Sequence, residues 1–434
     1  MTYDLKKTLN LAGNLLKSSV LGIATAGFVA GSAIAADNVA KPPVPAVSAE
    51  TVSAIAKEPE VAAYASWFRF DEDLKKQWKF VADPSDDNRL KIYAGSNSSG
   101  NVIIEPRHRV MILYPRKSSA YDLAVSKILN VFADRNIEAE FTVYNFNRDD
   151  ARGKEAIEIA GKKNIDLIFT MGSQSTAWLY DNYKGGKIPV VSVTSKDPVM
   201  LGQISNYNVG SSNNFAFTSL NMPVSAQLAY VFELKPNLKN LAVLVDSKNV
   251  SAVETQARPI AEAAIGKGIR VLNLAVQQPE NARQELSEMV ADAVAAMRKN
   301  DVNLENSIFW VTGSTSVFRE IRTINKYADR VPVLSVVPEV VKEGGESATL
   351  SIGISFESNA QLAAIYGLKV LQKEVNVGSL NVGVVSPPDI AINFRKAREI
   401  GLRVPFTFIE GANYIFDYDG KAVRKGGKNV RTDG

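Results

Sequence analysis

Short apolar runs alternate with longer amphipathic stretches along most of the chain. The first such run, residues 110–114, precedes a helical pattern over residues 121–135. A run that is apolar throughout is typical of a strand buried on both faces of a parallel sheet. Strands that alternate with helices of this length predict an α/β fold in which helices cover both faces of the sheet.

This alternation occurs in two successive units. A polar, Asn-rich stretch over residues 203–217 interrupts it, and the same pattern then resumes. Each unit has a Gly-Ser turn after its third strand, at Gly172-Ser173 and at Gly313-Ser314. We therefore predict two Rossmann-like lobes with parallel sheets. The predicted strands are 110–114, 137–144, 166–171 and 188–193 in the first unit and 241–245, 270–275, 307–312 and 331–336 in the second.

The tail that follows these units contains a further strand, a strong helix and an extended segment. If it passes back and forth between the units, more than one strand joins the lobes, which predicts a multi-strand hinge near residues 217–222, 345–356 and 380–393. The predicted division gives the first lobe residues 107–220 and a return segment at about 355–380. It gives the second lobe residues 221–350 and a C-terminal segment at about 381–434.

Residues 1–36 have the pattern of a secretory signal peptide. Lysines precede a Gly/Ala-rich apolar run at residues 20–30, and Ala33-Ile34-Ala35 offers small residues for cleavage. The run is short and glycine-rich for a membrane-spanning helix, so a cleaved signal is favoured over an uncleaved anchor. The chain has no cysteine, which a lipid anchor requires. We expect a soluble periplasmic protein that is not lipid-anchored.

Residues 37–106 differ from the rest of the chain. The segment to about residue 62 is rich in Ala, Val, Pro and Lys and predicts a flexible leader. The remainder is aromatic-rich and has turn signals at residues 83–88 and 95–100. We expect an appended element with a helix over 71–80 and a hairpin. Its rings should pack on the main body, since large rings usually serve as buried apolar area.

Composition argues against several classes of function. The net charge of +4 is not concentrated in any basic run, so we expect no nucleic-acid binding. One histidine and no cysteine disfavour a zinc site or a Ser-His-Asp triad. Neither a P-loop nor a G-x-G-x-x-G motif is present. We therefore expect a protein that is not an enzyme and has no cofactor or metal.

Candidate binding residues follow from one rule: in open parallel sheets, ligands bind beyond the carboxyl ends of the strands. Hydroxyls are frequent there in the first unit, whereas the carboxylates Asp246 and Glu339 appear in the second. A helix end with hydroxyls suits an anion, and carboxylates suit a cation, so the pair would suit an amino acid. The predicted ligand-binding residues are Ser118, Ser119, Gly172, Ser173, Ser175, Thr176, Ser195, Asp197, Phe217, Asp246, Thr312, Ser314 and Glu339.

Each of these residues also has a simpler interpretation. Ser173 or Ser175 would serve equally well as an ordinary helix N-cap, and Asp246 as a turn residue. Lys196, beside Ser195, is expected to be solvated. Tyr114 is an alternative to Phe217 for stacking on an apolar part of the ligand.

Several stretches resemble those of a known family. Residues 166–177 are similar to a family strand that ends in glycine and small polar residues. Ile-Pro-Val-Val at 188–191, followed by Asp-Pro-Val at 197–199, is similar to its I-P-[IV]-V…D-P-V segment. Residues 223–246 and 392–405 follow the order of its later motifs. Over residues 109–405 the chain thus resembles the ABC-transporter substrate-binding proteins of the type I periplasmic binding fold, in the branch that includes aromatic amino-acid binders.

This resemblance implies a bilobed receptor that captures a small, amino acid-like ligand. It would deliver that ligand to an ABC permease in the inner membrane, and we expect a monomer. A periplasmic sensory module that reports to a membrane receptor is the alternative, because the same fold serves both roles. The chain departs from the family in its missing anchor cysteine, in residues 62–106, and in Asn-Asn-Phe-Ala at 213–216, where Thr-Gly-[VT]-Ser is usual.

Overall fold

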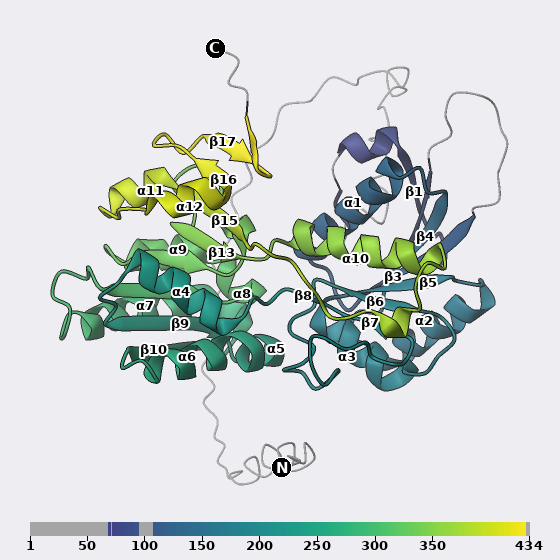
Figure 1. Cartoon of the computed structure of the whole chain (residues 1–434), viewed down its shortest axis with the longest axis horizontal. Helices are drawn as coiled ribbons and strands as arrows, with labels where there is room; N and C mark the ends of the chain where they lie inside the picture. Colours follow the sequence, from purple (N-terminus) through teal and green to yellow (C-terminus); the bar gives the residue numbers. More distant parts are fainter. Residues whose placement is uncertain (1–67, 71, 95–106, 431–434) are drawn as a thin grey trace, which may run out of the picture. The chain divides into compact units, whose positions relative to one another are not determined.

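The computed structural model describes residues 68–70, 72–94 and 107–430. The predicted signal peptide, the leader and the turn at 95–100 lie outside these residues. The described chain forms two α/β lobes, each built on its own sheet, as the sequence predicts (Figure 1). Within the described ranges, no helix has both the length and the apolar character needed to cross a bilayer.

The first lobe is built on a seven-stranded sheet in the order β1-β2-β4-β3-β5-β6-β7. From β3 to β7 the neighbouring strands run parallel. The strands are β1 (Trp78–Ala82), β2 (Arg89–Ala94), β3 (His108–Tyr114), β4 (Ala139–Asn145), β5 (Leu167–Met171), β6 (Val190–Val193) and β7 (Phe215–Ala216).

Helices cover both faces of this sheet, because alternate residues of each strand point to opposite sides. Val110 and Ile112 of β3 belong to the core that includes α1 (Ser119–Asp134) and α10 (Phe356–Leu371). Met111 and Leu113 belong to the core of the other face, with α2 (Asp150–Lys162) and α3 (Gly172–Tyr183). Continuous apolar strands are therefore required here, as the sequence pattern indicates.

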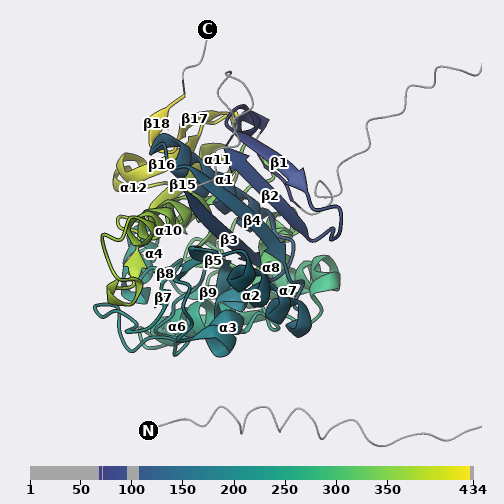
Figure 2. The ribbon, with the colours of Figure 1, turned by 90° about the vertical axis from the view of Figure 1, so that its right-hand side faces the viewer.

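The aromatic-rich N-terminal segment is part of this sheet rather than an appendage. Strand β2 pairs antiparallel with β4, and β1 pairs with β2 at the sheet edge (Figure 2). Ile92 of β2 is fully buried. The rings of Phe68 and Trp78 are also buried, which confirms that these two rings pack in the core. The predicted helix over 71–80 is only a short 3-10 helix, η2 (Glu72–Lys76), because the backbone enters the sheet at Trp78.

The second lobe is built on a nine-stranded sheet in the order β10-β9-β11-β12-β13-β15-β16-β17-β18. The first five of these strands run parallel, and β15 is antiparallel to β13. The strands are β9 (Asn240–Asp246), β10 (Arg270–Val276), β11 (Ser307–Val311), β12 (Val333–Ser335), β13 (Leu350–Gly353), β15 (Asp389–Asn393), β16 (Ala412–Phe416), β17 (Ala422–Lys425) and β18 (Lys428–Asn429).

The helical stretch after β9 is interrupted. It comprises α5 (Val250–Ala252), a π-helical segment at 253–257 and α6 (Arg258–Ile265). The sequence analysis did not predict the C-terminal strands β16–β18, which extend this sheet. The remaining helices are α4 (Val224–Leu234), α7 (Ala282–Met297), α8 (Thr315–Phe318), α9 (Ile321–Tyr327), α11 (Phe394–Glu399) and α12 (Phe406–Gly411).

In the part of the chain that the structure describes, three connections join the lobes, which agrees with the predicted multi-strand hinge. Two of them contain β8 (Thr218–Ser219) and β14 (Gly383–Val384), which pair in parallel as a small separate sheet. The third leads from β13 into α10. The buried Asn359 of α10 accepts hydrogen bonds from the Thr194 N–H (2.7 Å) and the Thr218 hydroxyl (3.2 Å), and donates to the Ser219 carbonyl (3.1 Å). One side chain thus ties α10 to the end of β6 and to a hinge strand.

Because β2 is an interior strand of the first sheet, truncation of its buried side chain should destabilise the lobe. Ile92→Ala should lower the free energy of unfolding by about 2–5 kcal/mol, the usual cost of removing a buried Ile or Leu side chain. Val81→Ala, at a 37% exposed site on the edge strand β1, is the control and should cost about 0.5 kcal/mol. Urea unfolding followed by circular dichroism measures both; equal effects would contradict this role of β2.

Candidate ligand-binding site

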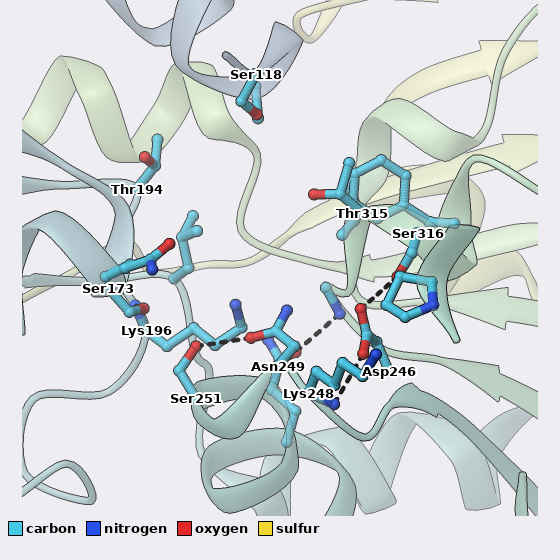
Figure 3. Close-up of a pocket in the computed structure, with 18 of the residues that line it drawn as sticks. Ser118, Ser173, Thr194, Lys196, Asp246, Lys248, Asn249, Ser251, Thr315 and Ser316 are labelled. Atoms are coloured by element: carbon cyan, nitrogen blue, oxygen red, sulfur yellow. Dashed lines mark hydrogen bonds between the residues drawn. The ribbon is translucent and has the colours of Figure 1, made fainter. Parts of the chain in front are cut away.

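A cleft of about 1280 Å³ is lined by residues that follow strands of both sheets. On the first lobe, Thr194 and Lys196 follow β6, and Ser173 lies in the first turn of α3. On the second lobe, Asp246 ends β9 and Ser316 lies in α8. Figure 3 shows the two sets on opposite sides of the cleft. The strand-end rule therefore points to residues that line this cleft.

Lys196 is buried in the first-lobe wall, contrary to the expectation that it is solvated. Its side chain points into the cleft (Figure 3), and the residue is only 9% exposed. Within the described part of the chain, its ammonium forms no hydrogen bond or ion pair. Burial, and to a smaller extent the nearby Arg116 guanidinium, lower the pKa of Lys196 to about 8. A buried charge without a counter-ion is costly, and a bound anion would relieve that cost.

The backbone beside Lys196 is held in an unusual conformation. Thr194 has a φ of 51°, which is rare for a β-branched residue. The hydrogen bond from its N–H to Asn359 keeps it there. Its Oγ1 atom is buried without a hydrogen-bond partner among the described residues, as is Oε1 of Gln203, another lining residue. Unsatisfied polar groups on the wall of a cleft are suited to a polar ligand.

The turn at Gly172-Ser173 shapes the same wall. Gly172 has a φ of 77°, and a Cβ atom there would lie 2.1 Å from the Tyr121 hydroxyl, so the position requires glycine. Ser173 lines the cleft, and its Oγ accepts a hydrogen bond from the Lys196 N–H at 2.9 Å. The start of α3 and the end of β6 are thereby fixed to each other.

The next hydroxyls of α3 point away from the cleft. The Ser175 hydroxyl donates to the Leu113 carbonyl (3.1 Å) and lies 2.6 Å from that of Thr170. The Thr176 hydroxyl donates to the Gly172 carbonyl at 2.9 Å. Both residues are fully buried and are not among those that line the cleft. Of the predicted helix-end residues, only Ser173 therefore lines the cleft.

Other predicted residues of the first lobe divide in the same way. Ser118 lines the cleft, whereas Ser119 is exposed outside it and Ser195 is buried behind it. Asp197 accepts hydrogen bonds from the N–H groups of Val199 and Met200 and from the Tyr207 hydroxyl, and so holds the following loop.

The two aromatic residues proposed for stacking lie in the core. Phe217 is 1% exposed and stacks on Phe215, with ring centroids 5.9 Å apart. Tyr114 is fully buried, and its hydroxyl donates to Asp122 at 3.2 Å. The ring that lines the first-lobe wall is instead Tyr121.

On the second lobe, Asp246 is the predicted residue that lines the cleft. Its carboxylate accepts hydrogen bonds from the Lys248 N–H (2.8 Å) and the Ser316 hydroxyl (2.6 Å). Ser314 lies behind it and accepts from the Asp246 N–H at 3.3 Å, while Thr312 donates to the Leu244 carbonyl at 2.9 Å. These contacts orient a carboxylate that has no ion-pair partner among the described residues.

Glu339, the other predicted carboxylate, is half-buried and is not among the residues that line the cleft. One of its oxygens accepts the Phe356 N–H at 2.6 Å, and the other has no partner within the described ranges. Burial raises the pKa of Glu339 to about 8, so this group is neutral at pH 7. It supports the start of α10, whose Phe356 lines the cleft.

The sequence analysis missed several lining residues that carry charge. Arg148 follows β4 and Glu280 follows β10, two strands whose carboxyl ends it did not consider. The same rule applied to every strand would have found both. Further charged residues that line the cleft are Arg116, Lys248, Arg283, Arg319 and Glu320.

Comparison with known families gives one match that covers most of the chain. Residues 109–413 match the family described as ABC transporter substrate binding protein. A comparison with curated proteins found no match.

Solved structures share the fold. A conserved domain protein from Vibrio cholerae is 17% identical with a TM-score of 0.57, and the match covers 71% of this chain and 99% of that one. An ABC domain in complex with L-Trp from Streptococcus pneumoniae is 17% identical with a TM-score of 0.55, and the match covers 71% of this chain and 99% of that one. A substrate-binding protein with adhesive properties from Clostridium difficile, in a ligand-free, open structure, is 20% identical with a TM-score of 0.53. That match covers 70% of this chain and 98% of the other. These likenesses confirm the predicted type I periplasmic binding fold.

The cost of the buried ammonium leads to a testable consequence for stability. Lys196→Met should raise the free energy of unfolding of the unliganded protein at pH 7 by about 3 kcal/mol, because the pKa falls from 10.5 to about 8 and one pKa unit corresponds to about 1.4 kcal/mol. The folded-state pKa lies below the unfolded value, so the penalty is complete below pH 8 and disappears as pH rises towards 10.5. The stability gained by Lys196→Met should therefore become smaller as pH rises from 7 to 10.

Urea unfolding at pH 7 and at pH 10 measures this difference. Lys117→Met, at an exposed site of the first lobe, is the matched control and should change stability little. A destabilised Lys196→Met protein would contradict the idea that this charge lacks a partner.

Proposed function

Because the chain belongs to the ABC transporter substrate-binding protein family, we propose that it captures a small solute in the cleft between its lobes and delivers it to an ABC permease. Substrate-binding proteins of ABC importers act outside the cytoplasm. The signal-peptide pattern of residues 1–36 supports a periplasmic location for this one.

The favoured ligand is an amino acid, and one observation carries this assignment. Opposite charges without ion-pair partners in the described chain line the two walls: the Lys196 ammonium on the first lobe and the Asp246 carboxylate on the second. A zwitterionic ligand would place its carboxylate at Lys196, with Ser173 and Thr194 beside it, and its ammonium at Asp246. The L-Trp complex of the Streptococcus pneumoniae protein, which shares the fold, is in keeping with a ligand of this class.

A ligand that contacts both walls would also couple binding to closure. It would bind more tightly when the lobes approach each other, so binding shifts the population towards the closed state. The hinge lies close to the first-lobe wall, which the ligand would contact, because Asn359 joins Thr194 to β8 and α10. Closure of the lobes would then accompany ligand capture, and their opening would accompany release.

A screen of L-amino acids by thermal shift, followed by calorimetry, tests the proposal, since a bound ligand raises the melting temperature by mass action. Asp246→Asn keeps the shape but removes the charge, and should weaken binding about tenfold or more, the usual value of a hydrogen bond to a charged group. Glu262→Gln, at an exposed site of α6, should bind as the wild type does. Unchanged affinity in Asp246→Asn would contradict the assignment of the ligand ammonium.

The pH dependence of binding tests the other half of the site. Unliganded Lys196, with a pKa of about 8, loses its proton as pH rises, so affinity should fall roughly fourfold between pH 7 and pH 8.5. The ligand's own ammonium also titrates. Because Lys196→Met lacks the lysine ammonium, the pH dependence of its affinity, measured by calorimetry, gives the ligand's part alone. Identical pH profiles in the two proteins would show that Lys196 does not bind the ligand carboxylate.

A further inference from the structure

The two walls of the cleft differ in their balance of charge. Within the described chain, the lining residues of the first lobe include three cations, Arg116, Arg148 and Lys196, and no Asp or Glu. Those of the second lobe carry both signs, and Arg283 there pairs with Glu320 at 3.0 Å. One carboxylate of a zwitterion would neutralise only part of the first-lobe charge.

Two of these cations, Arg116 and Arg148, lie near the Tyr121 ring, and Arg116 also lies near Lys196. The Arg116 guanidinium is 5.9 Å from the centre of the Tyr121 ring. Arg116 also lowers the pKa of Lys196, and both arginines act to lower the pKa of the Tyr121 hydroxyl, although its burial raises that pKa overall. Like charges on one wall repel one another, and the arrangement becomes favourable when anions bind among them.

Among the described residues, no carboxylate neutralises either arginine. Arg116 donates to the neighbouring Lys117 carbonyl at 3.1 Å, and Arg148 donates to Oε1 of Gln174 at 3.1 Å. Both partners are uncharged, and no ion pair forms at either side chain within the described ranges. Gln174 itself lines the cleft, so its contact keeps the Arg148 guanidinium at the wall. Planar guanidinium groups are well suited to bind carboxylate or phosphate through paired hydrogen bonds.

We propose that the ligand carries a second anionic group, bound by Arg116 and Arg148, in addition to the carboxylate at Lys196. The inference rests on the proposed function and narrows it: the ligand is an α-amino acid with an anionic side chain, either a carboxylate or a phosphate. Lys196 and Asp246 hold the α-carboxylate and the α-ammonium, and the arginines select the side chain.

A different use of the same arginines is ion pairing across the cleft. Glu280 of the second lobe is exposed, lines the cleft and forms no ion pair within the described chain. If Arg116 or Arg148 paired with it on closure, the arginines would stabilise the closed state whatever the ligand. Substitution would then weaken every ligand equally, whereas a ligand-binding role affects only anionic side chains.

The test compares matched ligands by calorimetry on the full-length mature protein. The anionic members are L-aspartate, L-glutamate and O-phospho-L-serine, and the neutral isosteres are L-asparagine, L-glutamine and L-serine. At least one anionic member should bind about tenfold or more tightly than its isostere, because a charged hydrogen-bond partner is lost in the isostere. Preference for O-phospho-L-serine over both dicarboxylates would identify the second group as a phosphate.

Variants then assign this preference to the arginines. Arg116→Gln and Arg148→Gln should each weaken binding of the anionic member at least threefold more than binding of its isostere. Arg135→Gln, at an exposed site at the end of α1, is the matched control and should retain the wild-type ratio.

Three results would overturn the inference. Equal binding of an anionic member and its isostere would do so while leaving the proposed function intact. If the Arg116→Gln and Arg148→Gln variants weakened binding of the anionic ligand and of its isostere equally, the arginines would instead stabilise the closed state. Absence of binding to every amino acid in the panel would overturn the proposed ligand class together with this inference.

Discussion

A positive charge buried without an anion is the constraint on which the cleft depends. Lys196 is 9% exposed, its ammonium lacks a counter-ion within the described chain, and Arg116 lies close enough to lower its pKa further. Folding alone would favour an apolar residue there, because buried ions are stable only when they are paired. The fold keeps the lysine in place by fixing its backbone: the Lys196 N–H is bound by Ser173, and Thr194 is held by Asn359. An anionic ligand that pairs with this ammonium would remove the free-energy cost of burying it.

The same contacts connect the site to the hinge. Asn359 binds the end of β6 and strand β8, and it lies on α10, which begins at Phe356 beside the cleft. The first turn of α10 is held by carboxyl groups of the second lobe, since Glu339 accepts the Phe356 N–H and Asp389 accepts the Ser355 N–H. A ligand bound at the first-lobe wall, as proposed, would therefore contact residues next to two of the connections between the lobes. This arrangement gives binding a short physical path to lobe closure.

Apolar patterning was enough to predict the two lobes, because strands buried on both faces leave a clear signal in the sequence. This patterning was not enough to place β2 in the first sheet. The partner of β2 is β4, which is distant in sequence, and the local sequence does not show which strands pair. At the site, the strand-end rule found Ser173 but also chose Thr176, whose hydroxyl is used within its own helix. Lys196 was expected to be solvated because most lysines are. Its burial follows from tertiary packing, which the sequence pattern does not contain.

The most direct test of this account is the proton uptake that accompanies ligand binding. Once a ligand has been identified, calorimetry at pH 8 in buffers of different ionisation enthalpy gives the number of protons bound. Lys196 is about half protonated in the empty site at this pH, so binding of an anion should take up about half a proton. Lys196→Met should take up none at this site. Equal proton uptake by the two proteins would contradict the central claim that the ligand anion binds to the buried Lys196 ammonium.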